Sequence, residues 1–275
     1  MVLRLDPRLP LVWRSPTSLQ LGVSRAVVVL DEVSVAMERM LSALAGGIPH
    51  AGLAMIGRSA GLGGDEVEAF LGRIAPALLR APAPAAGRVV VVTGEGPTAE
   101  AVTRLLAAEG FAVRIARTAA DAERESCDIA VAVGHFVLEP VLHGLWLRRD
   151  IPHLPVLVSD AGATVGPLVE PGRSACLYCV QLHTTDADPA WPAIASQLWG
   201  RSAAADTPLV ASEAAAIAAR IIVGWASVGA VSASGRTMLD AATGETTTVP
   251  VTPHPACGCL EPGRTNSEAT AAVSR

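Results

Sequence analysis

The sequence predicts an α/β protein in which a small α+β unit precedes a doubly wound, mostly parallel sheet. In the later part of the chain, apolar strand segments alternate with amphipathic helical segments, the pattern of βαβ units. In the earlier part, short strand segments come first and three short helical segments follow. An Ala- and Pro-rich stretch, residues 81–87, separates the two patterns and is expected to be a linker. The expected domains are therefore residues 1–80 and 88–262, with a frayed tail at residues 263–275.

The first domain is expected to begin with three short strands, at residues 11–13, 19–21 and 26–30. Ser34 can then cap a helix whose apolar positions recur with a 3.6-residue period, and Gly46-Gly47 can end it. A second helix can start at Pro49.

The third expected helix opens with an acidic turn. Asp65 and Glu68 resemble a capping box at its start. Its apolar face is expected to contain Val67, Phe70, Leu71, Ile74 and Leu78. Short strands with three helices are the parts of a winged helix-turn-helix, whose third helix would face DNA phosphates. The carboxylates at that position argue against DNA binding.

The second domain is expected to begin with a strand buried on both faces, at residues 89–92. A helix at residues 98–109 follows, and further strands are expected at residues 111–116, 129–133 and 154–158. A helix through Leu142 and Leu145 connects the last two of these strands. In the C-terminal third, the pattern predicts a short strand between Gly162 and Gly166, a helix at residues 213–227 capped by Ser212, and strands at residues 237–239 and 246–251.

Composition excludes several functions. All 21 basic residues among 275 are arginine, so a Schiff-base lysine and a Walker A loop are impossible. The net charge of -5 offers no electrostatic footprint for nucleic acid. The N-terminus has no secretion signal, and the most apolar stretch, residues 214–231, is interrupted by Arg220. We therefore expect a cytoplasmic protein with neither a nucleic acid nor a membrane partner.

Four of the five cysteines form two tight pairs, Cys176 with Cys179 and Cys257 with Cys259. Two short-loop pairs can supply the four thiolates of a closed, structural zinc site. Two reduced cysteine pairs without metal, or a redox pair, are the alternatives. Cys127 is expected to be a packing residue. His254, three residues before Cys257, could replace a ligand or contact one.

Gly94-x-Gly96-x-x-Ala99 follows a strand and precedes a helix, as in a dinucleotide fingerprint. Pro97 removes one amide donor from the first helical turn, and the next strand ends in Arg114–Arg117 where a ribose-binding carboxylate is expected. We therefore expect a degenerate loop that binds no cofactor.

Trp191 and Trp199 are eight residues apart. This helical spacing suggests a shared face in the core or at a subunit interface.

The cysteine region resembles the ThiF-like proteins of azole-modified peptide pathways, of the actinobacterial type. The likeness rests on Glu170-Pro171-Gly172-Arg173-Ser174-Ala175-Cys176-Leu177-Tyr178-Cys179, on Asp188-Pro189-Ala190-Trp191-Pro192 and on His254-Pro255-Ala256-Cys257-Gly258-Cys259. It implies a PqqD-like winged-helix module followed by a ThiF-type sheet domain with a four-cysteine zinc site. It also implies a role in bacteriocin-type natural product biosynthesis: binding a precursor's leader peptide and presenting the core to a YcaO-type, ATP-dependent cyclodehydratase.

We expect the leader to pair with a strand edge, in a groove between residues 26–30 and 65–74. Phe70 or Leu71 would be one wall, and Glu66 and Glu68 would favour basic leaders. Alternatively, this unit merely covers the sheet domain.

Active ThiF-type enzymes need a ribose carboxylate, a phosphate lysine and a magnesium aspartate. Here the first position is arginine, the second is excluded by composition, and the third is Gly134-His135. No catalytic residue is therefore expected. An adenylyltransferase and an orphan dimeric scaffold are the alternative functions, and the sequence leaves a homodimer open.

Overall fold

The computed structural model describes residues 2–79, 87–228 and 235–260, and the chain divides into two compact units. Unit 1 comprises residues 1–81 and unit 2 comprises residues 82–275. The expected tail and all of the expected linker except Gly87 lie outside the described residues.

In unit 1, three short strands form an antiparallel sheet in the order β2-β3-β4. They are β2 (Leu11–Trp13), β3 (Leu19–Leu21) and β4 (Val28–Leu30), close to their predicted positions. A separate antiparallel pair joins β1 (Val2–Leu3) to β5 (Ile48–Pro49). Because β3 is central, β2 and β4 are the two edges of the three-stranded sheet.

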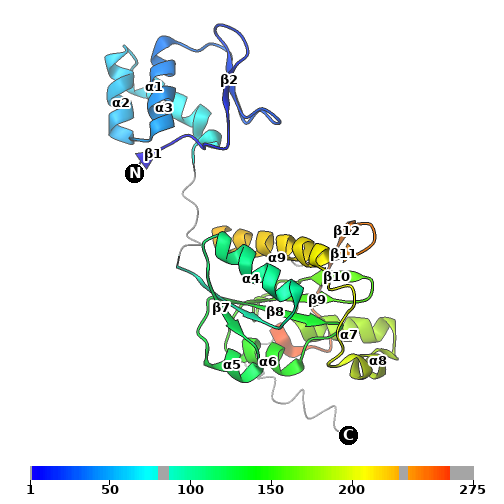
Figure 1. The fold of residues 1–275 in the computed structure, drawn as a ribbon. Coiled ribbons are helices and arrows are strands. Elements are labelled where there is room, and N and C mark those ends of the chain that lie inside the picture. The colour runs from blue at the N-terminus through cyan, green and yellow to red at the C-terminus, as the bar shows by residue number, and fades with distance from the viewer. Residues whose placement is uncertain (1, 80–86, 229–234, 261–275) are drawn as a thin grey trace. The chain divides into compact units, whose positions relative to one another are not determined.

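Three helices follow, and they lie beside one another in Figure 1: α1 (Val35–Gly46), α2 (His50–Ser59) and α3 (Gly64–Ile74). Ser34 caps α1 as predicted, since its side chain accepts from the Met37 amide at 3.2 Å. The predicted start of α3 was wrong. The Glu66 carboxylate reaches back one turn to accept from the Gly63 amide at 2.7 Å, which Asp65 and Glu68 do not do.

The core of unit 1 lies between its sheet and its helices. Leu19, Leu21 and Leu30 from the sheet are buried with apolar side chains of all three helices. Leu78, which was expected on α3, instead follows a 3₁₀ turn at Ala75–Ala77 and forms a β-bridge with Leu5.

Unit 2 is built on a seven-stranded sheet in the order β12-β11-β10-β9-β8-β6-β7. Its first four strands, β6 (Val89–Thr93), β7 (Ala112–Ala116), β8 (Ile129–His135) and β9 (His153–Val158), are paired in parallel. Antiparallel pairing then adds β10 (Gly162–Val165), β11 (Gly235–Asp240) and β12 (Thr246–Pro250). The parallel half confirms the predicted βαβ pattern.

Helices cover both faces of this sheet, as Figure 1 shows. On one face, α4 (Pro97–Ala108) and α9 (Pro208–Val228) pack together over Val90 and Val92. On the other, α5 (Ala119–Arg124) and α6 (Pro140–Arg148) pack over Val91. Helix α5 was not predicted from the sequence. Between β10 and α9 lie two further helices, α7 (Leu177–Ala187) and α8 (Trp191–Leu198).

Helix α9 begins earlier than predicted. Ser212 lies inside it and donates to the Pro208 carbonyl at 2.7 Å, so Ser212 is not the N-cap. By length and composition alone α9 could cross a membrane, but half of that stretch is buried inside unit 2. A core helix explains its apolar composition.

Candidate functional site

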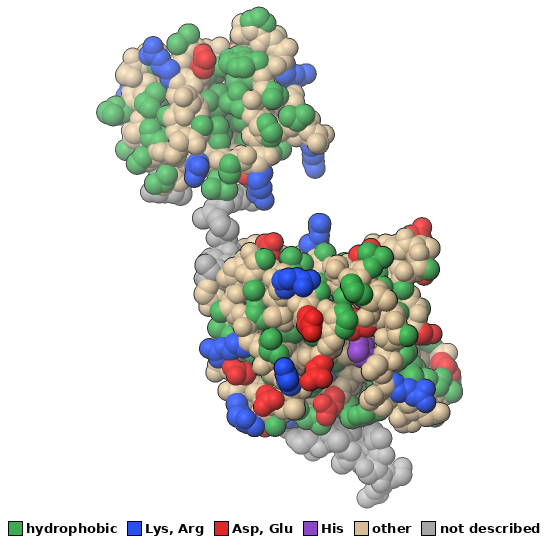
Figure 2. Space-filling model, viewed as in Figure 1, with side chains coloured by type: hydrophobic (Ala, Val, Ile, Leu, Met, Phe, Trp, Pro, Cys, Tyr) green, Lys and Arg blue, Asp and Glu red, His purple; other side chains and the backbone are tan. Residues whose placement is uncertain are grey.

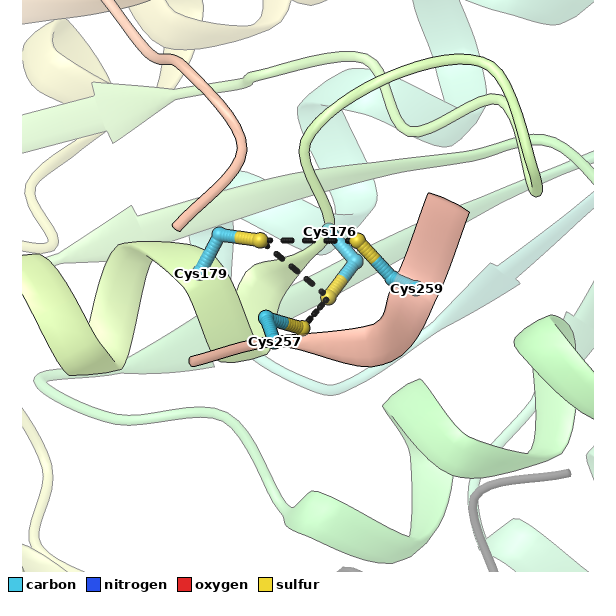
Figure 3. Close-up of side chains that lie close together, drawn as sticks. All are labelled: Cys176, Cys179, Cys257 and Cys259. Carbon is cyan, nitrogen blue, oxygen red and sulfur yellow. Dashed lines mark hydrogen bonds between the residues drawn. The ribbon is translucent and has the colours of Figure 1, made fainter. Parts of the chain in front are cut away.

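The four paired cysteines converge at one place in unit 2, although some eighty residues separate the pairs (Figure 3). Cys176 is the N-cap of α7, and Cys179 lies in the first turn of that helix. Cys257 and Cys259 come from the segment after β12, where a 3₁₀ turn at Gly258–Leu260 brings both sulfur atoms to the same side.

The separations of the sulfur atoms fit a tetrahedral metal. The Sγ atoms lie 3.9 Å apart in Cys176–Cys179, 3.6 Å in Cys176–Cys257 and 3.5 Å in Cys179–Cys259. A tetrahedral zinc ion with Zn–S bonds of about 2.3 Å holds its sulfur atoms about 3.8 Å apart. A disulfide needs about 2.05 Å, and all four cysteines are free. The cluster could therefore hold a metal ion.

Burial makes bare thiolates unfavourable here. Desolvation raises the pKa of Cys176, and it raises that of Cys257 to about 12. Desolvation also pushes the pKa of Cys179 upward, but hydrogen bonds from the backbone of His254 and Cys176 and from neighbouring thiols outweigh it and lower that pKa. A bound cation would supply the charge needed to keep all four sulfurs deprotonated.

A set of hydrogen bonds braces the C-terminal segment against α7. His254 accepts from the Ala256 amide at Nδ1 (3.0 Å), so its Nε2–H donates to Asp186 (2.9 Å). His183 donates to the Thr252 carbonyl at 2.9 Å. Donor atoms of His183, Asp186 and His254 lie within 4.8 Å of one another, but both ring nitrogens of His254 are already engaged. His254 therefore supports the cysteine cluster and does not replace one of its ligands.

The glycine loop connects β6 to α4, as predicted. Gly94 has a φ of 110°, and a Cβ there would lie 2.3 Å from the Val133 carbonyl oxygen, so the close approach of the loop to β8 requires glycine. Gly96 has a φ of 93° and is the N-cap of α4, while Ala99 is buried in the first turn of that helix.

One residue at this loop was missed by the sequence analysis. Asp206, just before α9, accepts from the amide and hydroxyl of Thr98 and contacts His135 Nε2 at 2.9 Å. Thr207-Pro208 indicates a helix start, which the interpretation of Ser212 as the cap overlooked. Nothing in the sequence indicates that Asp206 contacts Thr98 and His135.

A cavity of about 330 Å³ opens beside this loop, at the carboxyl ends of β6 and β8. Its lining includes His135, Arg117, Glu139, Trp199 and Arg201. The carboxyl ends of parallel strands are where α/β sheets bind ligands.

Arg114, within β7, and Arg117, just after it, have different roles. Arg114 pairs with Glu125 at 2.9 Å, while Arg117 lines the cavity. As expected, neither position supplies a carboxylate for a ribose.

The two tryptophans do not share a buried helix face. Trp191 begins α8 and donates to Gln181 at 2.6 Å, whereas Trp199 follows the helix and is 56% exposed. A core position is therefore wrong for Trp199, and the alternative, a subunit interface, stays a prediction.

In unit 1, the residues expected to form a peptide groove have other roles. Phe70 and Leu71 are only 1% and 8% exposed, so the expectation that one of them forms an open pocket wall was wrong. Glu66 caps α3, and Glu68 lies 3.0 Å from His50. Both carboxylates are therefore engaged within the unit, which weakens the expected preference for basic peptides.

Comparison with known proteins gives likenesses of structure only. No family model matches the sequence, and no curated protein matches it. The heterocyclase TruD superposes with a TM-score of 0.71 at 17% identity, covering 94% of this chain and 42% of the heterocyclase. A heterocyclase in complex with substrate and cofactor superposes with a TM-score of 0.69 at 16% identity. This match covers 94% of this chain and 39% of that heterocyclase. This chain thus spans about two fifths of the length of those heterocyclases.

A third likeness extends over nearly the whole of the other protein. E. coli MccB with ATP gives a TM-score of 0.63 at 12% identity, covering 94% of this chain and 99% of MccB. This likeness agrees with the expected ThiF-like sheet. The comparisons show that this chain has the fold that these heterocyclases and MccB share.

Proposed function

We propose that this chain is a leader-peptide-binding partner protein. It presents a precursor peptide to a YcaO-type, ATP-dependent cyclodehydratase in the cytoplasm and has no catalytic residue of its own. The fold shared with the heterocyclase TruD over 94% of the chain supports a place in the biosynthesis of modified ribosomal peptides. A heterocyclase of the same fold has been solved with substrate and cofactor, and E. coli MccB with MccA.

The observation that carries this proposal is the three-stranded sheet of unit 1, in which β2 and β4 each pair only with β3 among the residues that the structure describes. A free edge can take an extended peptide as a further strand through main-chain hydrogen bonds. Beside β4, Val27 is exposed, and on β2 both Leu11 and Trp13 are exposed. Figure 2 shows hydrophobic side chains on the viewed face of this unit, with arginines near its rim. Such exposed apolar side chains next to a strand edge suit a peptide partner.

The acidic side chains of α3 favour peptide over DNA. We propose that the unit is a winged-helix-like, PqqD-like module. If such a module bound DNA, α3 would be the helix that contacts the duplex. The first turn of α3 exposes Asp65 and Glu66, and Glu68 follows one turn later. Nucleic-acid binders place arginine or lysine opposite phosphates, so this helix would repel a duplex.

The proposed cofactor is one structural zinc ion, held by Cys176, Cys179, Cys257 and Cys259. The separations of the sulfur atoms and the all-thiol donor set support it. Four protein ligands leave no position for a substrate, so the ion would tie the C-terminal segment to α7 and take no part in chemistry.

Charge substitutions at the sheet edges test where the leader binds. We expect Val29→Asp on β4 to weaken binding of a fluorescein-labelled leader peptide at least tenfold, because we propose that the leader pairs with the β4 edge. Trp13→Asp tests the β2 edge, and Met55→Asp on the exposed surface of α2 is the matched control. Fluorescence polarisation with the full chain provides the readout. Equal affinity in all three variants would argue against both edges.

The second candidate function is a ThiF-type adenylyltransferase. The likeness to MccB with ATP favours it, because that likeness covers nearly all of both proteins. The absence of lysine and the loss of the expected carboxylates disfavour it.

We expect no ATP–pyrophosphate exchange by the isolated chain, with or without peptide. Arginine does not replace the phosphate-binding lysine at such a site. Exchange above background would favour the adenylyltransferase. The third candidate, an orphan dimeric scaffold, predicts neither exchange nor peptide binding.

A further inference from the structure

The start of α4 has almost no donors left for a ligand. In a dinucleotide-binding fold, the free amides of the first helical turn hold phosphate. Here Pro97 has no amide hydrogen, and the Thr98 amide donates to Asp206 at 3.2 Å. The Glu100 amide is already in the first bond of the helix, to Gly96. Among the helical residues Pro97 to Glu100, only the amide of Ala99 remains.

Asp206 is held in this position by three contacts and by burial. Its side chain is only 4% exposed. One carboxylate oxygen accepts from the amide and hydroxyl of Thr98, and the other lies 2.9 Å from His135 Nε2. A charged group this deeply buried needs partners on both oxygens, and α4 and β8 supply them.

The glycine fingerprint has an explanation that involves no nucleotide. A Cβ on Gly96 would lie 2.9 Å from the carboxylate oxygen of Asp206 that contacts His135. Glycine at this position therefore makes room for a carboxylate of the same chain. The anion favoured by a helix N-terminus is already present.

We propose that Asp206 is an intramolecular substitute for phosphate: its carboxylate occupies the oxyanion position at the start of α4 and excludes phosphate-bearing ligands from it. The residue thereby determines what the neighbouring cavity can accept, since a ligand there must do without the helix amides. It also ties the start of α9 to α4 and β8. Peptide binding by unit 1 is independent of this inference and can hold or fail separately.

Replacement of Asp206 by alanine should vacate the oxyanion position. We expect Asp206→Ala to lower the melting temperature, and inorganic phosphate to restore part of the loss in a saturable way. Wild type should show only the small general effect of salt, measured against potassium chloride at equal ionic strength. Asp121→Ala is the matched control, because Asp121 accepts from Thr118 at the exposed start of α5.

Each outcome of this experiment supports or overturns the proposal that Asp206 occupies an oxyanion position. A saturable, phosphate-specific shift in Asp206→Ala alone supports the proposal. An equal shift in wild type shows that the position is open, and no specific shift in folded Asp206→Ala shows that no oxyanion position exists there; both overturn it. If Asp206→Ala does not fold in chloride, refolding in phosphate supports the proposal, and failure in both salts overturns it.

Discussion

At the scale of single residues, the same amino acid has different roles in different places. Cys127 is partly buried, and desolvation raises its pKa to about 11, so it remains a protonated packing residue. The paired cysteines lie at distances that a metal ion would bridge. Histidines divide in the same way: His254 braces the cysteine cluster, while His143 on α6 contacts the buried His153 of β9.

We predict that the His143–His153 pair makes the protein sensitive to acid. His153 donates from Nδ1 to the Ile151 carbonyl at 3.0 Å, so its Nε2 accepts from His143 at 3.1 Å. Burial lowers the pKa of His143 to about 3, helped by the charge of His153, and burial lowers that of His153 to about 4. The unfolded chain binds these protons near pH 6.5. Stability present above pH 6.5 is therefore lost as the pH falls toward 4.

Each of these histidines should contribute up to about 1.4 kcal/mol per pH unit within that window. Urea unfolding between pH 7 and pH 4.5 measures this slope. His143→Gln should flatten it, whereas His50→Gln, at an exposed position, should not. Both variants keep the cysteine cluster, so their difference isolates the histidine pair. Identical slopes would contradict the prediction.

We predict one zinc ion per chain, lost when a cysteine of the cluster is replaced. Structural zinc sites contribute an apparent binding free energy on the order of 10 kcal/mol, so Cys257→Ser should destabilise unit 2 severely. Cys127→Ser is the control. Elemental analysis and thermal unfolding with a chelator are the measurements. Protein without zinc that is indifferent to chelator would overturn the assignment.

At the scale of elements, local patterns predicted most strands, while the starts of two helices were predicted wrongly. The β-branched run of β6 and the period of α1 are local signals, and both elements lie as predicted. At α9 the Val210 amide donates to the Thr207 hydroxyl, so this helix begins at a local cap that the prediction of Ser212 passed over. Helix α5 is only six residues long, too short to show a period. The antiparallel addition of β10 to β9 is likewise set by the sheet as a whole.

The cap of α3 gives a prediction at this scale. Glu66→Ala removes the acceptor of the Gly63 amide and should lower the free energy of unfolding by about 1 kcal/mol. Asp65→Ala, one position earlier in the same exposed turn, should have a smaller effect, because no hydrogen bond to the Gly63 amide depends on it. Urea unfolding of the two variants compares them. A larger loss in Asp65→Ala would restore the cap expected from sequence.

At the scale of the whole molecule, the chain combines an α+β unit with a sheet unit in which Asp206 lies against the start of α4. The four-cysteine cluster could be predicted from sequence, since spacing alone indicates it. The role of Asp206 could not, because it depends on how the fold brings β8, α4 and α9 together. The partners of Glu66 and Glu68, the Gly63 amide and His50, were not predicted either, because the sequence alone does not show which groups a carboxylate contacts. The proposed function therefore depends on unit 1.

The affinity of unit 1 for a leader peptide tests this account most directly. The measurement is fluorescence polarisation of a labelled leader, encoded beside the gene for this chain, with the full chain and with residues 1–81 alone. The account predicts saturable binding of similar affinity to both, because unit 1 has its own core and carries the free strand edges. It also predicts weaker binding to duplex DNA. No binding by either protein, or tighter binding to duplex DNA than to the peptide, would contradict it.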